Sequence, residues 1–195
     1  MIRLFTSLCK SVLEKLSDKA IYQEVIGGFK YHNVQCPGCC AVGKLQSHGD
    51  YYRNFVFPDG EKIIESSLSP LRFKCVSCNT THALLPDIIV PYSPYSLRCM
   101  LTVLVAYFER TVTVAAVCAN YGIAVSTLYE WKNRLLEHKD LLLGMLQSKK
   151  EPVQAFLQSL FASTQLSEQL SNFFCRYAFS FLQGRTKATT RSHPP

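Results

Sequence analysis

Four cysteines, arranged as two closely spaced pairs, are the residues of this chain whose chemistry the sequence defines best. Each pair is a Cys-x-x-Cys sequence, and strand-like sequence lies between the pairs. Two residues between cysteines let both thiolates of a tight turn point at one centre. Two such turns supply the four sulfurs that tetrahedral Zn²⁺ takes in a closed structural site. The sequence therefore predicts a structural zinc ion with four ligands, which are Cys36, Cys39, Cys75 and Cys78.

Other interpretations of the same cysteines stay open. They can be buried thiols or disulfide partners, or one pair can be a redox motif of the thioredoxin type. The redox interpretation is disfavoured because no alternation of strands and helices surrounds either pair. Cys40 directly follows Cys39 and can replace it as a ligand, although the two-residue spacing favours Cys39. His82, four positions after Cys78, is a second candidate for a substitute ligand.

The composition indicates a folded protein with a basic surface. The chain has 195 residues, of which 48% are hydrophobic, so a packed core is expected rather than global disorder. The formal net charge of +7 permits a polyanionic partner. Nine cysteines, an odd number, favour metal binding over a complete disulfide framework. Thiols expected in apolar helical cores are those of Cys9, Cys99, Cys118 and Cys175.

The apolar stretches are too short for a membrane span or a signal peptide. The longest lies near residues 100–108 and is far below the length that crosses a bilayer. The first residues soon meet the charged side chains of Lys10 and Glu14. We therefore expect a soluble cytoplasmic protein with no membrane partner, in a compartment that keeps thiols reduced.

The order of the patterns predicts an α+β fold built from four successive segments. A helical lead-in, periodic over 5–26, comes first, and a small β-rich zinc ribbon with a proline-rich connector follows. Pro86, Pro91 and Pro94 predict that the connector is stiff and extended. An all-α helix-turn-helix domain and a helical C-terminal segment with a basic, disordered tail complete the chain. The expected boundaries are 1–28, 29–92, 93–150 and 151–195.

Residues 114–131 have the pattern of a helix-turn-helix. Gly122 lies where the turn between the helices needs a positive φ. Ala124 stands where a capping serine or threonine is usual, so Ser126 or Thr127 is expected to cap the second helix. An ordinary helical hairpin with the same buried spacing is the alternative. The expected core positions are Val114, Val117, Cys118, Ile123, Leu128 and Trp131.

The second helix of this motif presents a polar face, which is how a recognition helix contacts the major groove. Glu130 suits a cytosine amino group and Asn133 suits adenine. Lys132, Arg134 and Arg110 suit phosphates, which give affinity without sequence information. An ordinary solvated helix face is the alternative for each residue. The candidate DNA-binding residues are Ser126, Thr127, Tyr129, Glu130, Lys132, Asn133 and Arg134.

No catalytic constellation is visible in the sequence, and we expect a protein that is not an enzyme. The acidic residues are scattered, and there is neither a Walker loop nor a dinucleotide-binding glycine motif. A nuclease core of the RNase H type needs an α/β domain with spaced carboxylates that hold two metal ions. The residues after Trp131 are too few for such a domain.

The C-terminal segment is unusually rich in large apolar side chains. They need a surface to cover, which is either the helical domain or a second protomer in a homodimer. The residues concerned are Phe156, Leu160, Phe161, Phe173, Phe174, Phe179 and Phe181.

Three motifs together resemble the amino-terminal region of bacterial insertion-sequence transposases. They are Cys36-Pro-x-Cys39, the His-Gly-x-Tyr-x-Arg sequence from His48 to Arg53, and Leu-Arg-Phe-Lys-Cys-x-x-Cys ending at Cys78. Those transposases open with a zinc ribbon followed by a helix-turn-helix. The run from Thr81 to Ser96 is similar to a short bacterial family built from these modules without the nuclease. The resemblance implies that the four paired cysteines are zinc ligands. It also implies that the protein either recognises the ends of a mobile element or is a regulator derived from such a protein.

The sequence therefore favours a zinc-dependent, sequence-specific protein that binds double-stranded DNA and lacks its own nuclease core. One alternative is the DNA-recognition subunit of a separately encoded transposase or integrase. Another is a module in which the zinc ribbon and the phenylalanine-rich helices bind protein rather than DNA.

Overall fold

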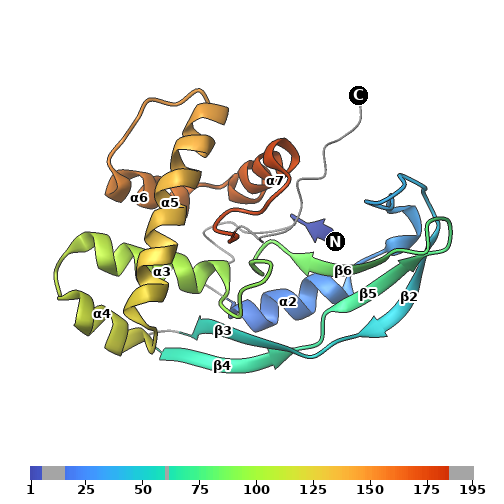
Figure 1. Cartoon of the computed structure of the whole chain (residues 1–195), viewed down its shortest axis with the longest axis horizontal. Helices are drawn as coiled ribbons and strands as arrows, with labels where there is room; N and C mark the ends of the chain where they lie inside the picture. Colours follow the sequence, from blue (N-terminus) through green and yellow to red (C-terminus); the bar gives the residue numbers. More distant parts are fainter. Residues whose placement is uncertain (6–15, 60–61, 185–195) are drawn as a thin grey trace.

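The chain folds into small sheets and helices, so the expected mixture of α and β structure is confirmed (Figure 1). The structure is a computed structural model that describes residues 1–5, 16–59 and 62–184. The strands are β1 (Ile2–Leu4), β2 (Leu45–Asp50), β3 (Arg53–Asp59), β4 (Lys62–Leu68), β5 (Leu71–Cys75) and β6 (Thr81–Pro86). The helices are α2 (Asp18–Gly27), the short 3-10 helix η1 (Tyr31–Asn33), α3 (Leu97–Glu109), α4 (Val114–Tyr121), α5 (Val125–Met145), α6 (Val153–Ala162) and α7 (Leu166–Tyr177).

One four-stranded sheet carries the paired cysteines, and we call it the cysteine sheet. Its strand order is β1-β6-β5-β2, with β5 antiparallel to both neighbours and β1 parallel to β6. Alternation along β5 turns Phe73 and Cys75 to the inner face, where a small apolar cluster forms. The buried members of that cluster are Ile2, Cys36, Leu45, Phe73, Cys75 and Leu84.

Strands β3 and β4 form a separate two-stranded hairpin. Phe55 and Phe57 of β3 are buried in the large core of the molecule, together with Ile21 of α2 and Met100 of α3. The sequence predicted one β-rich module over 29–92. The hairpin instead packs with the helices, because Phe55 and Phe57 are buried in the large core and not in the cluster of the cysteine sheet.

The proline-rich segment 86–94, predicted to be an extended connector, is largely buried and contains turns. Ile88, Ile89 and Val90 are at most 1% exposed, because these side chains fill the large core. Two arginines hold the backbone of this segment. Arg3 donates to the Ile89 carbonyl at 2.8 Å, and Arg53 donates to the Val90 carbonyl at 2.7 Å.

Helices α4 and α5 meet at a short turn that begins with Gly122. This glycine has φ +61° and its N–H donates to the last carbonyls of α4, as its sequence position predicted. Helix α5 begins at Val125 after Ala124, which offers no side-chain cap. The expectation that Ser126 or Thr127 caps α5 is wrong, because both lie inside its first turn.

The buried stripe of α5 supports the packing of this region. It includes Leu128, Trp131 and Leu135, and the Trp131 ring lies edge-on to the Tyr95 ring at a centroid distance of 4.8 Å. Expected core positions Val117, Cys118 and Ile123 are also buried, whereas Val114 is half-buried.

The phenylalanine-rich C-terminal helices cover α5 of the same chain. His138 of α5 is 3% exposed and lies within 5.7 Å, ring centroid to ring centroid, of Phe173, Phe179 and Phe181. Its Nδ1 accepts a hydrogen bond from the Leu182 N–H at 2.9 Å. Of the two surfaces that the sequence left open, the helical region of the same chain is therefore the one covered.

Some expectations fall partly on residues that the structure does not describe. The lead-in helix is seen only as α2, since 6–15, which include Cys9, lie outside the described residues. The basic tail 185–195 also lies outside them. In the described part of the chain, every helix is too short or too polar to traverse a lipid bilayer.

A buried carboxylate joins α2 to α3 and gives the fold a pH dependence. The Asp18 side chain is fully buried, 3.5 Å from Nε of Arg98, which also donates to the carbonyls of Leu16 and Pro58. Burial raises the pKa of Asp18 to about 6, against the opposing effects of a Ser96 hydrogen bond and the Arg98 charge. The raised pKa means that the neutral acid is the form that the folded state prefers.

We predict that Asp18→Asn removes this pH dependence. Because the folded pKa lies above the unfolded value of 3.8, stabilisation by the neutral acid is present at low pH and is lost as the pH rises through about 6. The difference in unfolding free energy, variant minus wild type, should therefore grow between pH 4 and 7, by at most about 3 kcal/mol. Urea unfolding of both proteins across this range measures it, and parallel curves would contradict the assignment.

Candidate metal centre

The two Cys-x-x-Cys sequences fold into turns with the same hydrogen-bond pattern. In each, the N–H of the first cysteine donates to the carbonyl five residues later, at 2.9 Å for Cys36 and 3.0 Å for Cys75. The N–H four residues after the first cysteine donates back to that cysteine's carbonyl, at 2.9 Å in both turns. The second turn joins β5 to β6, and the first precedes β2, so the strand pairing brings both turns to one end of the cysteine sheet.

The four sulfurs converge on one point. All four ligand atoms lie within 4.8 Å of one another, and the Sγ atoms of Cys36 and Cys78 and of Cys39 and Cys75 are 3.7 Å apart. A disulfide needs about 2.05 Å, so these separations do not fit disulfide pairing. Zn–S bonds of about 2.3 Å in a tetrahedron give sulfur separations of about 3.8 Å. The cluster is therefore positioned to bind a metal ion.

Hydrogen bonds lower the pKa values of some of these thiols, whereas the neighbouring thiols raise that of Cys39. The Thr80 hydroxyl and backbone N–H lower the pKa of the Cys78 thiol to about 6, and the backbone N–H of Cys78 lowers the pKa of Cys75. The backbone of Ala41 lowers the pKa of Cys39, but desolvation and the three neighbouring thiols together raise it to about 12. Four thiolates this close cannot all be charged unless a cation compensates them.

His82 contacts the cluster as a hydrogen-bonding neighbour and is not one of its four converging ligands. It is 4% exposed, and its Nε2 lies 3.3 Å from Sγ of Cys36. Its Nδ1 lies 3.2 Å from the amine of Met1, so Nδ1 accepts and the Nε2–H donates to the sulfur. Burial, and then the Met1 charge, lower the pKa of His82 and keep the ring neutral. Its pairing with Phe73 across β5 and β6, which turns it inward, could be found only once the register was known.

Cys40 does not join the cluster, although it is adjacent to Cys39. Its φ is +61°, in the left-handed region, and its side chain is exposed. Asn79 occupies the equivalent position of the second turn with φ +59°. Asparagine tolerates this conformation, whereas other non-glycine residues lose about 1–2 kcal/mol there.

The remaining described cysteines divide into two classes. Cys99 and Cys118 are buried, as the sequence predicted. Cys175 was also predicted to be a core thiol, but it is exposed. Helix α7 buries Leu170 and Phe173, and the residue two positions after Phe173 points away from that face.

The candidate DNA-binding residues lie in the first half of α5, opposite its buried stripe. Ser126, Tyr129, Glu130 and Asn133 are exposed, whereas Thr127, Lys132 and Arg134 are half-buried. Arg110, a further phosphate candidate, is exposed at the end of α3. The helix therefore gathers the predicted residues on one side.

Four of these residues already interact with one another in pairs. Arg134 forms an ion pair with Glu130, and its guanidinium occupies the space that a side chain at Gly184 would need. Lys132 Nζ lies 5.6 Å from the centroid of the Tyr129 ring. Lys132 is the basic residue of this face without an acidic partner among the described side chains.

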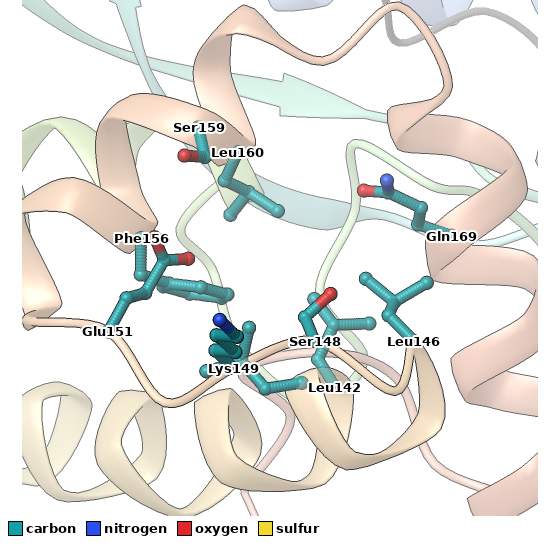
Figure 2. Close-up of a pocket in the computed structure, with 10 residues that line it drawn as sticks. Leu142, Leu146, Ser148, Lys149, Glu151, Phe156, Ser159, Leu160 and Gln169 are labelled. Carbon is teal, nitrogen blue, oxygen red and sulfur yellow. The ribbon is translucent and has the colours of Figure 1, made fainter.

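A surface hollow of about 420 Å³ lies at the other end of α5, between α5, α6 and α7 (Figure 2). Leu142, Phe156 and Leu160 form its apolar floor, and Lys149 and Glu151 stand together on its rim. None of the predicted site residues lines this hollow.

The fold and the cluster define a mixed α and β protein with a site able to bind a metal ion. Residues 36–131 match the model of a domain family of unknown function, DUF6431. No curated protein and no solved structure matches the chain. The matched range begins at the first cysteine of the cluster and ends at Trp131 in the core stripe of α5.

We predict that Cys75→Ser abolishes stoichiometric metal binding, while Cys40→Gly retains it. The first change removes one of four converging sulfurs, and the second removes only a strained side chain outside the cluster. Cys40→Gly should also keep or slightly raise the thermal midpoint, since relief of about 1–2 kcal/mol of strain outweighs the entropy that glycine adds to the unfolded chain. Elemental analysis and thermal melts check both. Loss of metal in Cys40→Gly would show that Cys40 is a ligand.

We predict that His82→Ala weakens metal binding by about 10- to 100-fold, because the hydrogen bond to Cys36 orients that ligand. Competition with a chromophoric chelator measures the affinity. The absorption spectrum of the Co²⁺-loaded variant should keep its four-thiolate form, and a changed spectrum would identify His82 as a ligand. His48→Ala, which alters an exposed histidine of β2, is the control and should leave both unchanged.

Proposed function

We propose that this chain is a zinc-dependent DNA-binding protein, in which α4 and α5 form a helix-turn-helix. The observation that carries the proposal is the two-sided character of α5. Leu128, Trp131 and Leu135 are buried, while Ser126 and Asn133 are exposed on the opposite side. A recognition helix needs this arrangement, because one face must pack while the other contacts bases.

Zinc is the metal that the cluster suits best. Four thiolates in a closed tetrahedral arrangement are typical of structural zinc. Soft sulfur ligands also bind other thiophilic metals, but the small apolar cluster of the cysteine sheet needs a structural ion. In the proposal, zinc contributes folding energy and performs no chemistry.

The electrostatics favour a polyanion. The formal net charge is +7, and Lys132 and Arg110 stand on or near the exposed side of α5. In the proposal they contact phosphates, while Asn133 contacts a base edge. Glu130 can reach a base only when its ion pair with Arg134 breaks. In the proposal, these two residues contact DNA only after that ion pair has opened.

The relation to transposases is a further part of the proposal. It is supported by the resemblance of the cysteine motifs to those at the amino-terminal end of insertion-sequence transposases. We assign no catalysis to this chain. In one alternative form of the proposal, the chain is the DNA-recognition subunit of a separately encoded transposase or integrase.

A protein-binding function for α5 is the second candidate, and one observation favours it. The exposed side of α5 carries apolar groups, since Val125, Tyr129 and Leu136 are 45%, 41% and 38% exposed. Such groups are more common at protein interfaces than at phosphate-binding surfaces. A homodimer through α5 would be one form of this function.

We predict that Lys132→Ala makes the fall of log affinity with log salt concentration shallower by about 1, because one phosphate contact is lost. The measurement is fluorescence anisotropy of labelled double-stranded DNA with metal-loaded protein at several salt concentrations. Asn133→Ala should instead cost about 1–3 kcal/mol at one base position, detected by selection from a randomised duplex library.

Lys149→Ala is the matched control. It removes the same charge from an exposed lysine just beyond the other end of α5, and its salt slope should stay at the wild-type value. Folded, metal-loaded protein that binds no duplex at low salt would refute DNA binding and favour the protein-binding function.

A further inference from the structure

Two tyrosines stand out on the surface away from α5. Tyr52 and Tyr92 are 73% and 75% exposed, the highest values among the large hydrophobic residues of the described chain. They border the same surface hollow of about 360 Å³, at the start of β3. Its other lining residues are Arg53, Asn54, Ser93 and Pro94.

A second hollow, of about 510 Å³, continues the first. The two share Tyr52, Asn54 and Pro94, so they form one elongated depression across the outer face of the β3–β4 hairpin. We call this depression the tyrosine groove. The second hollow adds Val56, Glu65, Ser66, Ser67 and Tyr95.

The walls of the tyrosine groove are held rigidly. Arg53 donates to the carbonyls of both Val90 and Ser93, which fixes the turn that carries Tyr92. On the other side, the Val56 N–H donates to the Pro94 carbonyl at 2.8 Å. The groove therefore has its shape before any partner arrives, which lowers the entropy cost of binding.

Tyr92 is held in a strained conformation. Its φ is +61°, in the left-handed region that costs a bulky residue about 1–2 kcal/mol. The residue is 75% exposed, so its burial does not offset the strain. Strained backbone positions cluster at functional sites, so an exposed aromatic ring at such a position indicates a binding role.

The charges of the tyrosine groove argue against a nucleic acid. The Arg53 guanidinium donates hydrogen bonds to two backbone carbonyls. Glu65 is the other ionisable charge of the lining, is exposed, and forms no ion pair with the described side chains. Among the described lining residues, phosphates would meet the exposed Glu65 carboxylate and no unpaired cation, whereas a basic side chain would find a partner.

Aromatic rings, an amide and hydroxyl groups are what a proline-rich segment requires. Such a segment forms an extended polyproline II helix without internal hydrogen bonds, so its carbonyls are free to accept. Proline rings dock between aromatic side chains such as Tyr52 and Tyr92. Asn54 and the tyrosine hydroxyls can donate to the free carbonyls.

We propose that the tyrosine groove binds a proline-rich segment of a partner protein that carries one basic residue, with that residue at Glu65. This interaction is separate from DNA binding by α5, and neither depends on the other. It gives the chain a second surface, through which it can bring another protein to the same place.

The test uses the full, metal-loaded chain and a peptide library with two fixed prolines, Pro-x-x-Pro, and one fixed arginine. We expect the library to yield binders by fluorescence anisotropy. Tyr52→Ala and Tyr92→Asn should each weaken the best binder by at least tenfold. Asparagine tolerates the left-handed conformation, so Tyr92→Asn should stay folded, and thermal melts check this.

Glu65→Gln should weaken the arginine peptide several-fold and leave a version with glutamine in place of arginine unaffected. Tyr129→Ala, which removes an exposed tyrosine from α5, is the control and should not change peptide binding. DNA titrations of Tyr52→Ala should match the wild type, which separates this proposal from DNA binding. No binder in the library, or binding indifferent to Tyr52 and Tyr92, overturns the proposal. Binding of oligothymidylate that Tyr52→Ala abolishes overturns it in favour of single-stranded nucleic acid.

Discussion

The convergence of four sulfurs is the constraint on which the rest of the structure depends. The cysteine sheet has a small buried cluster, and two of its six members are themselves cysteines of the metal site. Burial on this scale does not hold a sheet alone, so a metal ion bound by the four sulfurs would contribute to folding as well as to local geometry. Strand β6 then runs from the second cysteine turn into segment 86–94, inside the large core.

Buried charges at the end of β6 reinforce this connection. Arg3 lies in a mostly buried position, where desolvation lowers its pKa to about 10 and the Asp87 carboxylate opposes that shift. Asp87 also accepts a hydrogen bond from the Ser167 hydroxyl at 2.8 Å, which ties α7 to the same point. The cysteine sheet and the C-terminal helices thus share one junction, even though 80 residues separate Asp87 from Ser167.

Features set by local spacing could be predicted from the sequence, and features set by distant packing could not. The two-residue spacing of the cysteines and the position of Gly122 fix local turns, and both are found where the sequence placed them. The hairpin β3–β4 was misplaced because it does not join the cysteine sheet, and the choice of core depends on helices far along the chain. Prolines in segment 86–94 predicted a stiff, extended connector, but the apolar run Ile88–Val90 is buried in the core, where its side chains gain more stability. The exposed Cys175 was missed because composition does not reveal which side of a helix faces inward.

The burial of segment 86–94 has a consequence for how this molecule can change over evolutionary time. A surface linker absorbs inserted or deleted residues, and the parts it joins then drift in relative position. Here one added residue would displace the side chains of 88–90 from the places that they fill in the large core. The separation between the sulfur cluster and α5 is consequently fixed by packing, as it would not be with a flexible linker. Any partner that touches both must match that separation.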